Sequence, residues 1–185
     1  MKEYSRKYPE FSLCGLNCSL CPRFQTEGPS KCPGCGGKCF YEKHPTCSVI
    51  TCSQKHNGVE FCYDCEEFPC IKYDIPMKQD TFISKKNFIN DMKVAKNSIS
   101  KYLDELKAKQ NILEDLIKNF NDGRMKSYYC LAVNLIPLSG LKKVIDNIQR
   151  TAEKERIEVK EKAKMARDFL EKEAKSLGII IELRK

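Results

Sequence analysis

The sequence predicts a small cysteine-rich, metal-bound module followed by an α-helical part, and three observations lead to this fold class. Eleven of the twelve cysteines lie between Cys14 and Cys70. Before about residue 75 the chain is rich in Gly and Pro and its apolar residues show no period, whereas after it apolar residues recur at helical spacing. We therefore expect a metal-binding module over residues 1–75 and a helical hairpin or bundle over residues 76–185 that packs on it.

The cysteines of the module are spaced like those of zinc knuckles and zinc ribbons. Two residues separate the thiols of a CxxC turn, so both sulfurs can point at one ion while nearby backbone amides donate hydrogen bonds to the thiolates. Three such pairs occur in this chain. The full set of candidate metal ligands is Cys14, Cys18, Cys21, Cys32, Cys35, Cys39, Cys47, Cys52, Cys62, Cys65 and Cys70.

Zinc is the leading metal, because structural zinc is bound by four cysteine or histidine ligands. The eleven clustered cysteines with His44 and His56 give thirteen potential ligands, enough for two or at most three Zn²⁺ sites. We expect both histidines to be surface loop side chains, because cysteines already suffice for closed sites. Spacing alone leaves the pairing open. The grouping that we favour takes one site from Cys14, Cys18, Cys21, Cys32 and Cys35, and a second from Cys47 or Cys52 with Cys62, Cys65 and Cys70.

An iron–sulfur cluster is the alternative cofactor. The spacing Cys14-x3-Cys18-x2-Cys21 is the one with which radical S-adenosylmethionine enzymes hold a [4Fe–4S] cluster. In those enzymes the motif opens a much longer βα barrel, for which this chain has no room. The alternative is therefore a [4Fe–4S] cluster at Cys14, Cys18 and Cys21 without that enzymatic chemistry, since thiolates are also the usual ligands of clusters.

The expected cellular compartment also favours metal over disulfides. No stretch of 18 apolar residues is present, and the N-terminus lacks the apolar segment of a secretory signal. We therefore expect a cytoplasmic protein without a membrane span. Disulfides are rare in the reducing cytosol, where clustered cysteines are usually metal ligands or catalytic groups.

The first two helices of the C-terminal part are expected on either side of a sharp turn. From Thr81 to Phe120 apolar residues recur every three or four positions, which predicts a long helix. The Asn-Asp-Gly sequence at 121–123 stops it and caps the next one. The segment Met125–Leu135 is short and densely apolar and ends before Pro137, so it is the best candidate for a buried central helix.

A second long helix and a short strand complete the expected fold. Ser139 and Gly140 precede an amphipathic helix over residues 141–176, whose outer face carries acidic residues four positions before lysines. Gly178 ends that helix, and Ile179–Leu183 indicates a short C-terminal strand. The simplest architecture is an antiparallel hairpin of the two long helices, braced by the short helix.

Three residues near the central turn are further candidates. Cys130 lies in an apolar helix, where cysteine is usually a small buried hydrophobe, so we expect no metal there. Arg124 and Lys126 lie beside the turn and are candidates for an anion site at a helix N-terminus.

The first 70 residues contain, in order, the segments CGLNCSLCP, KCPGCGG, CSVITC and FCYDCEEFPC. This pattern resembles a cysteine-rich prokaryotic family that is catalogued as a domain of unknown function. The later segment Asp122–Leu138, DGRMKSYYCLAVNLIPL, is similar to a second signature of the longer members of that family. The resemblance implies a soluble, zinc-binding protein and carries no known activity.

Charge and motifs weigh against several function classes. The net charge of +8 resides in residues 76–185, but its 24 basic residues are interleaved with 16 acidic ones and form no stacking platform with aromatics. No Ser/His/Asp set, P-loop or dinucleotide motif indicates an enzyme. We expect a metal-stabilised module that binds an unidentified protein or small ligand. The open alternatives are an iron–sulfur protein, a metallochaperone or redox protein, and a nucleic-acid-binding zinc protein.

Overall fold

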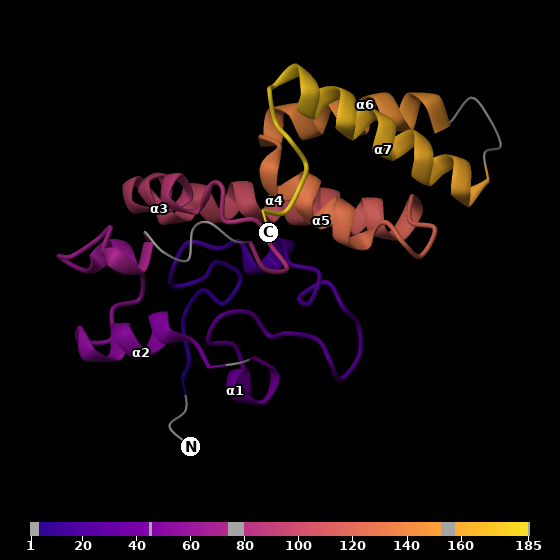
Figure 1. The fold of residues 1–185 in the computed structure, drawn as a ribbon. Helices are drawn as coiled ribbons and strands as arrows, with labels where there is room; N and C mark the ends of the chain where they lie inside the picture. The colour runs from indigo at the N-terminus through magenta and orange to yellow at the C-terminus, as the bar shows by residue number, and fades with distance from the viewer. Residues whose placement is uncertain (1–3, 45, 74–79, 153–157, 185) are drawn as a thin grey trace.

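Three layers make up the protein in this computed structural model, which describes residues 4–44, 46–73, 80–152 and 158–184. The cysteine-rich module forms one outer layer, α3, α4 and α5 form the middle, and a hairpin of α6 and α7 forms the other outer layer (Figure 1). The helices are α1 (Phe40–Lys43), α2 (Ser48–Lys55), α3 (Phe88–Asn97), α4 (Ile99–Asn119), α5 (Lys126–Leu135), α6 (Leu138–Ala152) and α7 (Val159–Ser176).

The predicted helix over residues 81–120 is two helices that meet at Ser98. The backbone of Ser98 is extended there, with φ −161°, and its Oγ accepts a hydrogen bond from the Lys101 amide at 3.5 Å. Serine is a strong helix N-cap, which explains why α4 begins anew at this residue. The prediction also started too early, because α3 begins at Phe88 and the side chain of Phe82 is 59% exposed.

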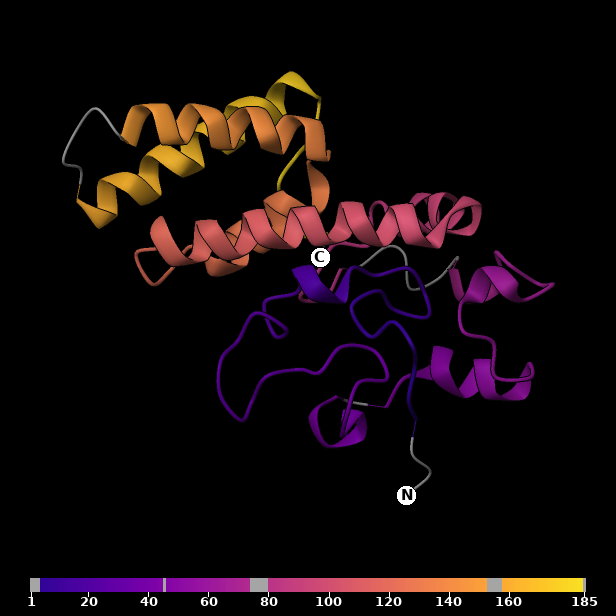
Figure 2. The same ribbon diagram turned by 180° about the vertical axis from the view of Figure 1, so that it is seen from behind.

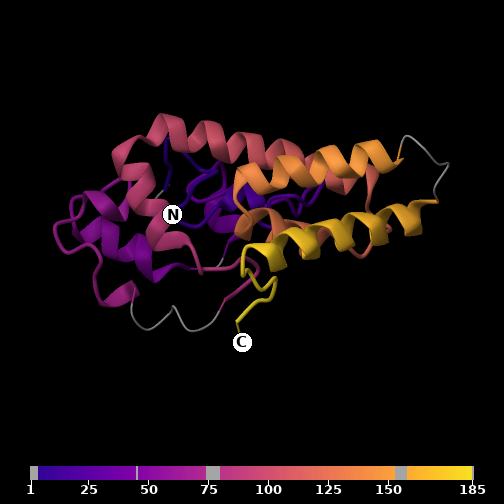
Figure 3. The same ribbon diagram turned by 90° about the horizontal axis from the view of Figure 1, so that it is seen from above.

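The predicted helix over residues 141–176 is also two helices, α6 and α7, which lie antiparallel (Figures 2 and 3). The sequence predicted that Ser139 and Gly140 precede this helix and cap it. Both residues lie inside α6, so that prediction was wrong. Residues 153–157, through which the prediction continued the helix, lie outside the described residues. One straight helix of this length would extend roughly 50 Å. Two antiparallel helices instead bury the apolar stripes of both, including Ile148 and Leu170.

The strand predicted at Ile179–Leu183 is absent, since the described residues contain no strand. This segment instead follows α7 as an irregular tail that binds the chain just before α3. The Arg184 amide donates to Asp80 Oδ2 at 2.9 Å, the Asp80 amide donates to the Arg184 carbonyl at 2.8 Å, and Lys86 Nζ donates to the Ile180 carbonyl at 2.9 Å. The tail has no neighbouring strand with which to form a ladder, and a lone strand is not stable.

The buried central helix is confirmed. In α5, Tyr129, Cys130 and Val133 are almost completely buried. The Tyr129 hydroxyl donates to the Phe120 carbonyl at 2.7 Å, which satisfies its polar group inside the core. The helix thereby joins the end of α4 to the hairpin layer, where Ala166 and Leu170 of α7 belong to the same apolar cluster.

The cysteine-rich module shares this main core and has only a small one of its own. Phe11, Leu20 and Phe61 lie in the same apolar cluster as Met92 of α3 and Leu106 of α4. A separate cluster inside the module is built on three buried residues, Leu13, Phe40 and Ile50. The rest of the module consists of loops, the short helices α1 and α2, and the 3-10 turns η1 (Cys18–Leu20), η2 (Cys62–Asp64) and η3 (Ile71–Tyr73).

None of the described helices combines the length and the apolar character that crossing a lipid bilayer requires.

Candidate functional site

Ten of the twelve cysteines line two cavities in the module, and all twelve are free thiols. The smaller cavity has a volume of about 30 Å³ and is lined by four of them, and the larger has a volume of about 220 Å³ and is lined by six. The four are Cys52, Cys62, Cys65 and Cys70. The six are Cys14, Cys18, Cys21, Cys32, Cys35 and Cys47. The structure therefore places Cys52, and not Cys47, with the last three cysteines of the module.

The smaller cavity lies between α2 and the two turns η2 and η3. His56, at the end of α2, lies at its edge, with Nδ1 2.9 Å from the Cys52 carbonyl oxygen and Nε2 3.4 Å from Glu67 Oε1. Burial raises the pKa of the Cys62 thiol to about 12, an effect that the nearby Tyr73 hydroxyl reduces. The thiols of this cavity thus come from three short segments of the chain.

The larger cavity lies between the loop at 14–21, the turn at 32–35 and the segment that enters α3. Residues 81–83 form the wall that comes from the helical part. Apolar side chains that include Leu16, Phe40 and Ile50 complete the lining. His44 also lies at this cavity, and its ring stacks on Phe40 with centroids 4.7 Å apart. Both histidines, expected on surface loops, therefore lie beside a cysteine cavity.

Tight turns bring the cysteines of each CxxC pair together. The Cys21 amide donates to the Cys18 carbonyl at 3.0 Å, and the Cys65 amide donates to the Cys62 carbonyl at 3.1 Å. In the third pair, Gly34 adopts φ +83°, and a Cβ at this position would collide with the Pro9 carbonyl. Glycine is required there because it alone combines a left-handed backbone with such a close approach.

Burial raises the pKa of several thiols of the larger cavity and so favours their neutral form. It raises the pKa of Cys14 to about 11, an effect that the hydrogen bond with Ser12 reduces and the charges of Cys35 and Cys47 increase. Burial likewise raises the pKa of Cys18 and of Cys35. A thiolate is the form that binds metal, so a bound cation would have to supply the free energy that deprotonates these groups.

Within the part of the chain that the structure describes, no group of three or more His, Cys, Asp or Glu side chains has the arrangement of a metal site. Metal ligation by the eleven cysteines therefore stays a prediction. The donor chemistry fits it, because the two cavities gather cysteine sulfurs, which as thiolates are the donors that soft and borderline metal ions prefer.

Two cysteines lie outside both cavities. Cys39 is exposed at the start of α1. Cys130 is 1% exposed in α5, and burial raises the pKa of its thiol to about 12. The prediction that Cys130 is buried in an apolar helix is confirmed.

Arg124 and Lys126, the predicted anion site, lie at the start of α5. Lys126 Nζ donates to Thr26 Oγ1 at 3.1 Å, so this lysine joins α5 to the cysteine-rich module. Arg124 is exposed, and its amide donates to Asp122 Oδ1 at 3.0 Å. Nothing further in this region indicates an anion, and the site stays a prediction.

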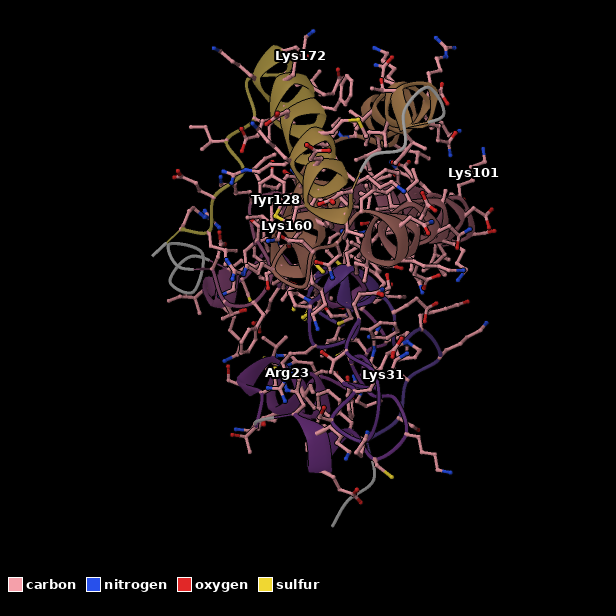
Figure 4. All side chains as sticks on the ribbon, turned by 90° about the vertical axis from the view of Figure 1, so that its right-hand side faces the viewer. Arg23, Lys31, Lys101, Tyr128, Lys160 and Lys172 are labelled. Carbon is pink, nitrogen blue, oxygen red and sulfur yellow. The ribbon has the colours of Figure 1, made fainter. Side chains whose placement is uncertain are left out.

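Basic side chains are distributed over both parts of the molecule. Arg23 and Lys31 belong to the module, Lys101 belongs to α4, and Lys160 and Lys172 belong to α7 (Figure 4). These labelled residues are spread across the view, so they do not form one patch for a nucleic-acid backbone.

A buried polar cluster behind the larger cavity was not predicted. Asn17 is 4% exposed, and its Nδ2 donates to Asp91 of α3 at 3.2 Å and to Asn134 of α5 at 3.0 Å. The Tyr102 hydroxyl of α4 donates to Asn17 Oδ1 at 2.8 Å. Asn17 thereby ties the loop of Cys14, Cys18 and Cys21 to three helices. In the sequence, only the position of Asn17 between Cys14 and Cys18 could have indicated a structural role for this residue. Its hydrogen-bond partners on the three helices become visible only in the folded structure.

Comparison with known proteins identifies the module. Residues 10–75 match the model of a protein family that is described as "Protein of unknown function (DUF3795)". The resemblance predicted from the cysteine pattern is thus confirmed. The matched segment, called the DUF3795 domain below after the model that it matches, contains all eleven clustered cysteines and the thiols of both cavities. No curated protein and no solved structure matches the chain.

Proposed function

We propose that the DUF3795 domain is a metal-binding module, in which thiolate-bound metal, zinc foremost, holds loops that present a surface to a protein or small ligand. The observation that carries this proposal is that ten free thiols, from segments between residues 14 and 70, line two cavities. Free thiols that serve only as small hydrophobes would not need to converge in this way.

The small core of the module supports a structural role for the metal. Leu13, Phe40 and Ile50 are the only three buried residues of the module's separate apolar cluster among those described. Such a core supplies little of the free energy that is needed to order about 60 residues of loop and short helix. Metal binding contributes that free energy in small metal-built domains, which are unfolded without their ion.

The smaller cavity suits a single zinc ion. Its four cysteines would supply the four ligands that a closed tetrahedral zinc site needs. Its volume of about 30 Å³ leaves space for one water-sized occupant. We therefore assign Cys52, Cys62, Cys65 and Cys70 to one zinc ion within this proposal.

Metal analysis of the anaerobically purified protein by mass spectrometry tests the proposal. We expect at least one equivalent of zinc per chain, and we expect Cys62→Ser to lose one equivalent. Cys130→Ala is the matched control, because that thiol is buried but lies outside both cavities. A protein that is folded by circular dichroism and contains no metal would refute the proposal.

A further inference from the structure

The two cysteine cavities differ in size far more than two equivalent zinc sites would. The larger, at about 220 Å³, has about seven times the volume of the smaller. A water molecule occupies about 30 Å³ of liquid, so the smaller cavity holds one occupant of atomic size, whereas the larger holds several. The larger cavity therefore has room for a group of several atoms.

The lining of the larger cavity restricts what that group can be. Six thiols face it, and among the remaining walls are the apolar side chains of Leu16, Ile50 and Ile83. A single ion with four thiolates would leave most of the space empty and two thiols without a role. An occupant with several metal atoms and soft, weakly hydrated surface atoms matches both the thiols and the apolar walls.

We propose that the larger cavity binds a [4Fe–4S] cluster through Cys14, Cys18, Cys21 and Cys35. This inference rests on the proposed metal-binding function and names the kind of centre in one of its two cavities. The core of such a cluster has eight atoms, four irons and four sulfides, whereas the smaller cavity has room for one occupant of atomic size. Such a cluster therefore fits the larger cavity and not the smaller one. Three of the ligands come from the loop at 14–21, and the fourth comes from the facing turn at 32–35.

The four sulfurs lie near one another, which favours these cysteines as the ligands. Burial raises the pKa of Cys18, and the charges of Cys35, Cys14 and Cys21 raise it further. Charges act in this way on a neighbouring thiol at short range, so these four sulfurs are neighbours in the cavity.

A buried cation offsets the charge of such a centre. Four thiolates with a [4Fe–4S]²⁺ core carry a net charge of about −2. The side chain of Arg6 is 2% exposed and forms an ion pair with Glu60 Oε1 at 3.2 Å, and its positive charge also favours the thiolate form of Cys35. Its Nη1 lies 3.5 Å from the Cys35 carbonyl oxygen and 2.8 Å from that of Phe11. An isolated anionic centre in an apolar cavity would be costly, and this guanidinium lowers that cost.

Iron and acid-labile sulfide, measured in protein that has been purified or reconstituted anaerobically with ferrous iron and sulfide, test the inference. We expect about four of each per chain, together with one zinc. The protein should show broad visible absorption that bleaches on reduction, and an electron paramagnetic resonance signal in the reduced state. Cys18→Ser and Cys35→Ser should each lose more than half of the iron while keeping the zinc.

Two controls separate the cavities and the ligands. Cys62→Ser should lose the zinc and keep the iron, because it lines the smaller cavity. Cys32→Ser lies in the same turn and the same cavity as Cys35 and should keep the cluster. The reverse result for Cys32 and Cys35 would overturn the ligand assignment.

The failure of this inference is distinguishable from that of the proposed function. A protein that binds only zinc, and takes up no sulfide on reconstitution, would overturn the cluster and leave the metal-binding module intact. A protein without any metal would overturn both. Sulfide analysis of the unmodified protein decides the question even if the serine variants do not fold.

Discussion

Gly15 is the residue that allows the loop of Cys14 and Cys18 to lie directly against α3. Its backbone has φ +95°, a conformation that L-residues rarely adopt. A Cβ at this position would lie 2.6 Å from the Phe88 carbonyl oxygen and would collide with Met92 Cγ. Phe88 and Met92 are buried on α3, so neither can move without opening the contact between the module and the helices.

We therefore expect Gly15→Ala to lower the free energy of unfolding by about 3 kcal/mol, the sum of backbone strain and overpacking. Gly28→Ala is a matched control, because Gly28 also has a positive φ, +78°, but a Cβ at this position would have no neighbour within 4 Å. That variant should lose only about 1 kcal/mol. Urea unfolding of both variants measures the difference, and equal losses would contradict the contact argument.

Asp91 gives the fold a pH dependence of its own. Burial raises its pKa to about 6, an effect that the charge of Lys109, the nearby Tyr102 hydroxyl and the hydrogen bond from Asn17 reduce. Glu105, also on α4, adds a smaller effect that raises the pKa further. Because the folded-state pKa exceeds the unfolded value of about 3.9, the protonated carboxyl favours folding. This contribution is complete below about pH 4 and is lost as the pH rises through about 6.

Asp91→Asn should remove this pH dependence. The stability of the variant relative to the natural protein should rise by about 2 kcal/mol between pH 4 and pH 7. Urea midpoints of both proteins, compared at matched metal content, measure the effect, since loss of metal in acid then cancels from the difference. If the difference in stability between the two proteins stays constant over this range, folding does not raise the pKa of Asp91.

At the scale of elements, the C-terminal tail holds the wall that closes the larger cavity. Residues 81–83 line that cavity, and Asp80 directly precedes them. The Asp80 side chain has no exposed surface and lies 2.9 Å from Arg184 Nη2. Its carboxylate also accepts hydrogen bonds from the Lys85 amide at 2.8 Å and from the Arg184 amide at 2.9 Å. The last described residues of the chain thus position a wall of the site.

Arg184→Ala should destabilise the protein by about 1–2 kcal/mol, because it leaves the Asp80 carboxylate buried without its cation. Burial alone would raise the pKa of Asp80, but the hydrogen bonds and charge of Arg184 lower it to about 2. The contribution is therefore present above about pH 4 and is lost as the pH falls towards 2. Arg167→Ala is the control, since its pair with Glu171 is exposed and should contribute below about 0.5 kcal/mol. Equal losses of thermal stability in the two variants would contradict the role of the tail.

The sequence predicted the type of most helical elements, and their ends and breaks depended on tertiary contacts. Apolar periodicity identified α5 and the apolar stripes that α4, α6 and α7 bury. It missed the break at Ser98, because the apolar period continues across it and only the cap geometry ends α3. The prediction of a strand at Ile179–Leu183 was wrong because residues that favour β-structure form a strand only where a partner strand exists.

At the scale of the whole molecule, the cysteine pattern predicted which residues form the candidate site but not how they divide. Spacing leaves Cys47 and Cys52 equally suited to join Cys62, Cys65 and Cys70. The chain separates them, because Cys47 precedes α2 and lines the larger cavity, whereas Cys52 lies within that helix and lines the smaller one. The sequence also did not predict the polar cluster around Asn17, because its partners Asp91 and Asn134 lie 74 and 117 residues away in the chain.

The molecule should respond to metal removal in two separate stages, because its two parts are stabilised differently. The helical part has an extensive apolar core that includes Leu113, Tyr129 and Leu170, whereas the separate core of the module is built on only three buried residues.

A strong chelator under reducing conditions should therefore make residues 10–75 accessible to trypsin, with early cleavage after Arg23 and Lys31. The far-UV circular dichroism of the helices should fall by less than about a third, because hydrophobic packing stabilises them independently of metal. Restoring the metal should restore protection. If the module stays protease-resistant after complete metal removal, its fold does not depend on metal.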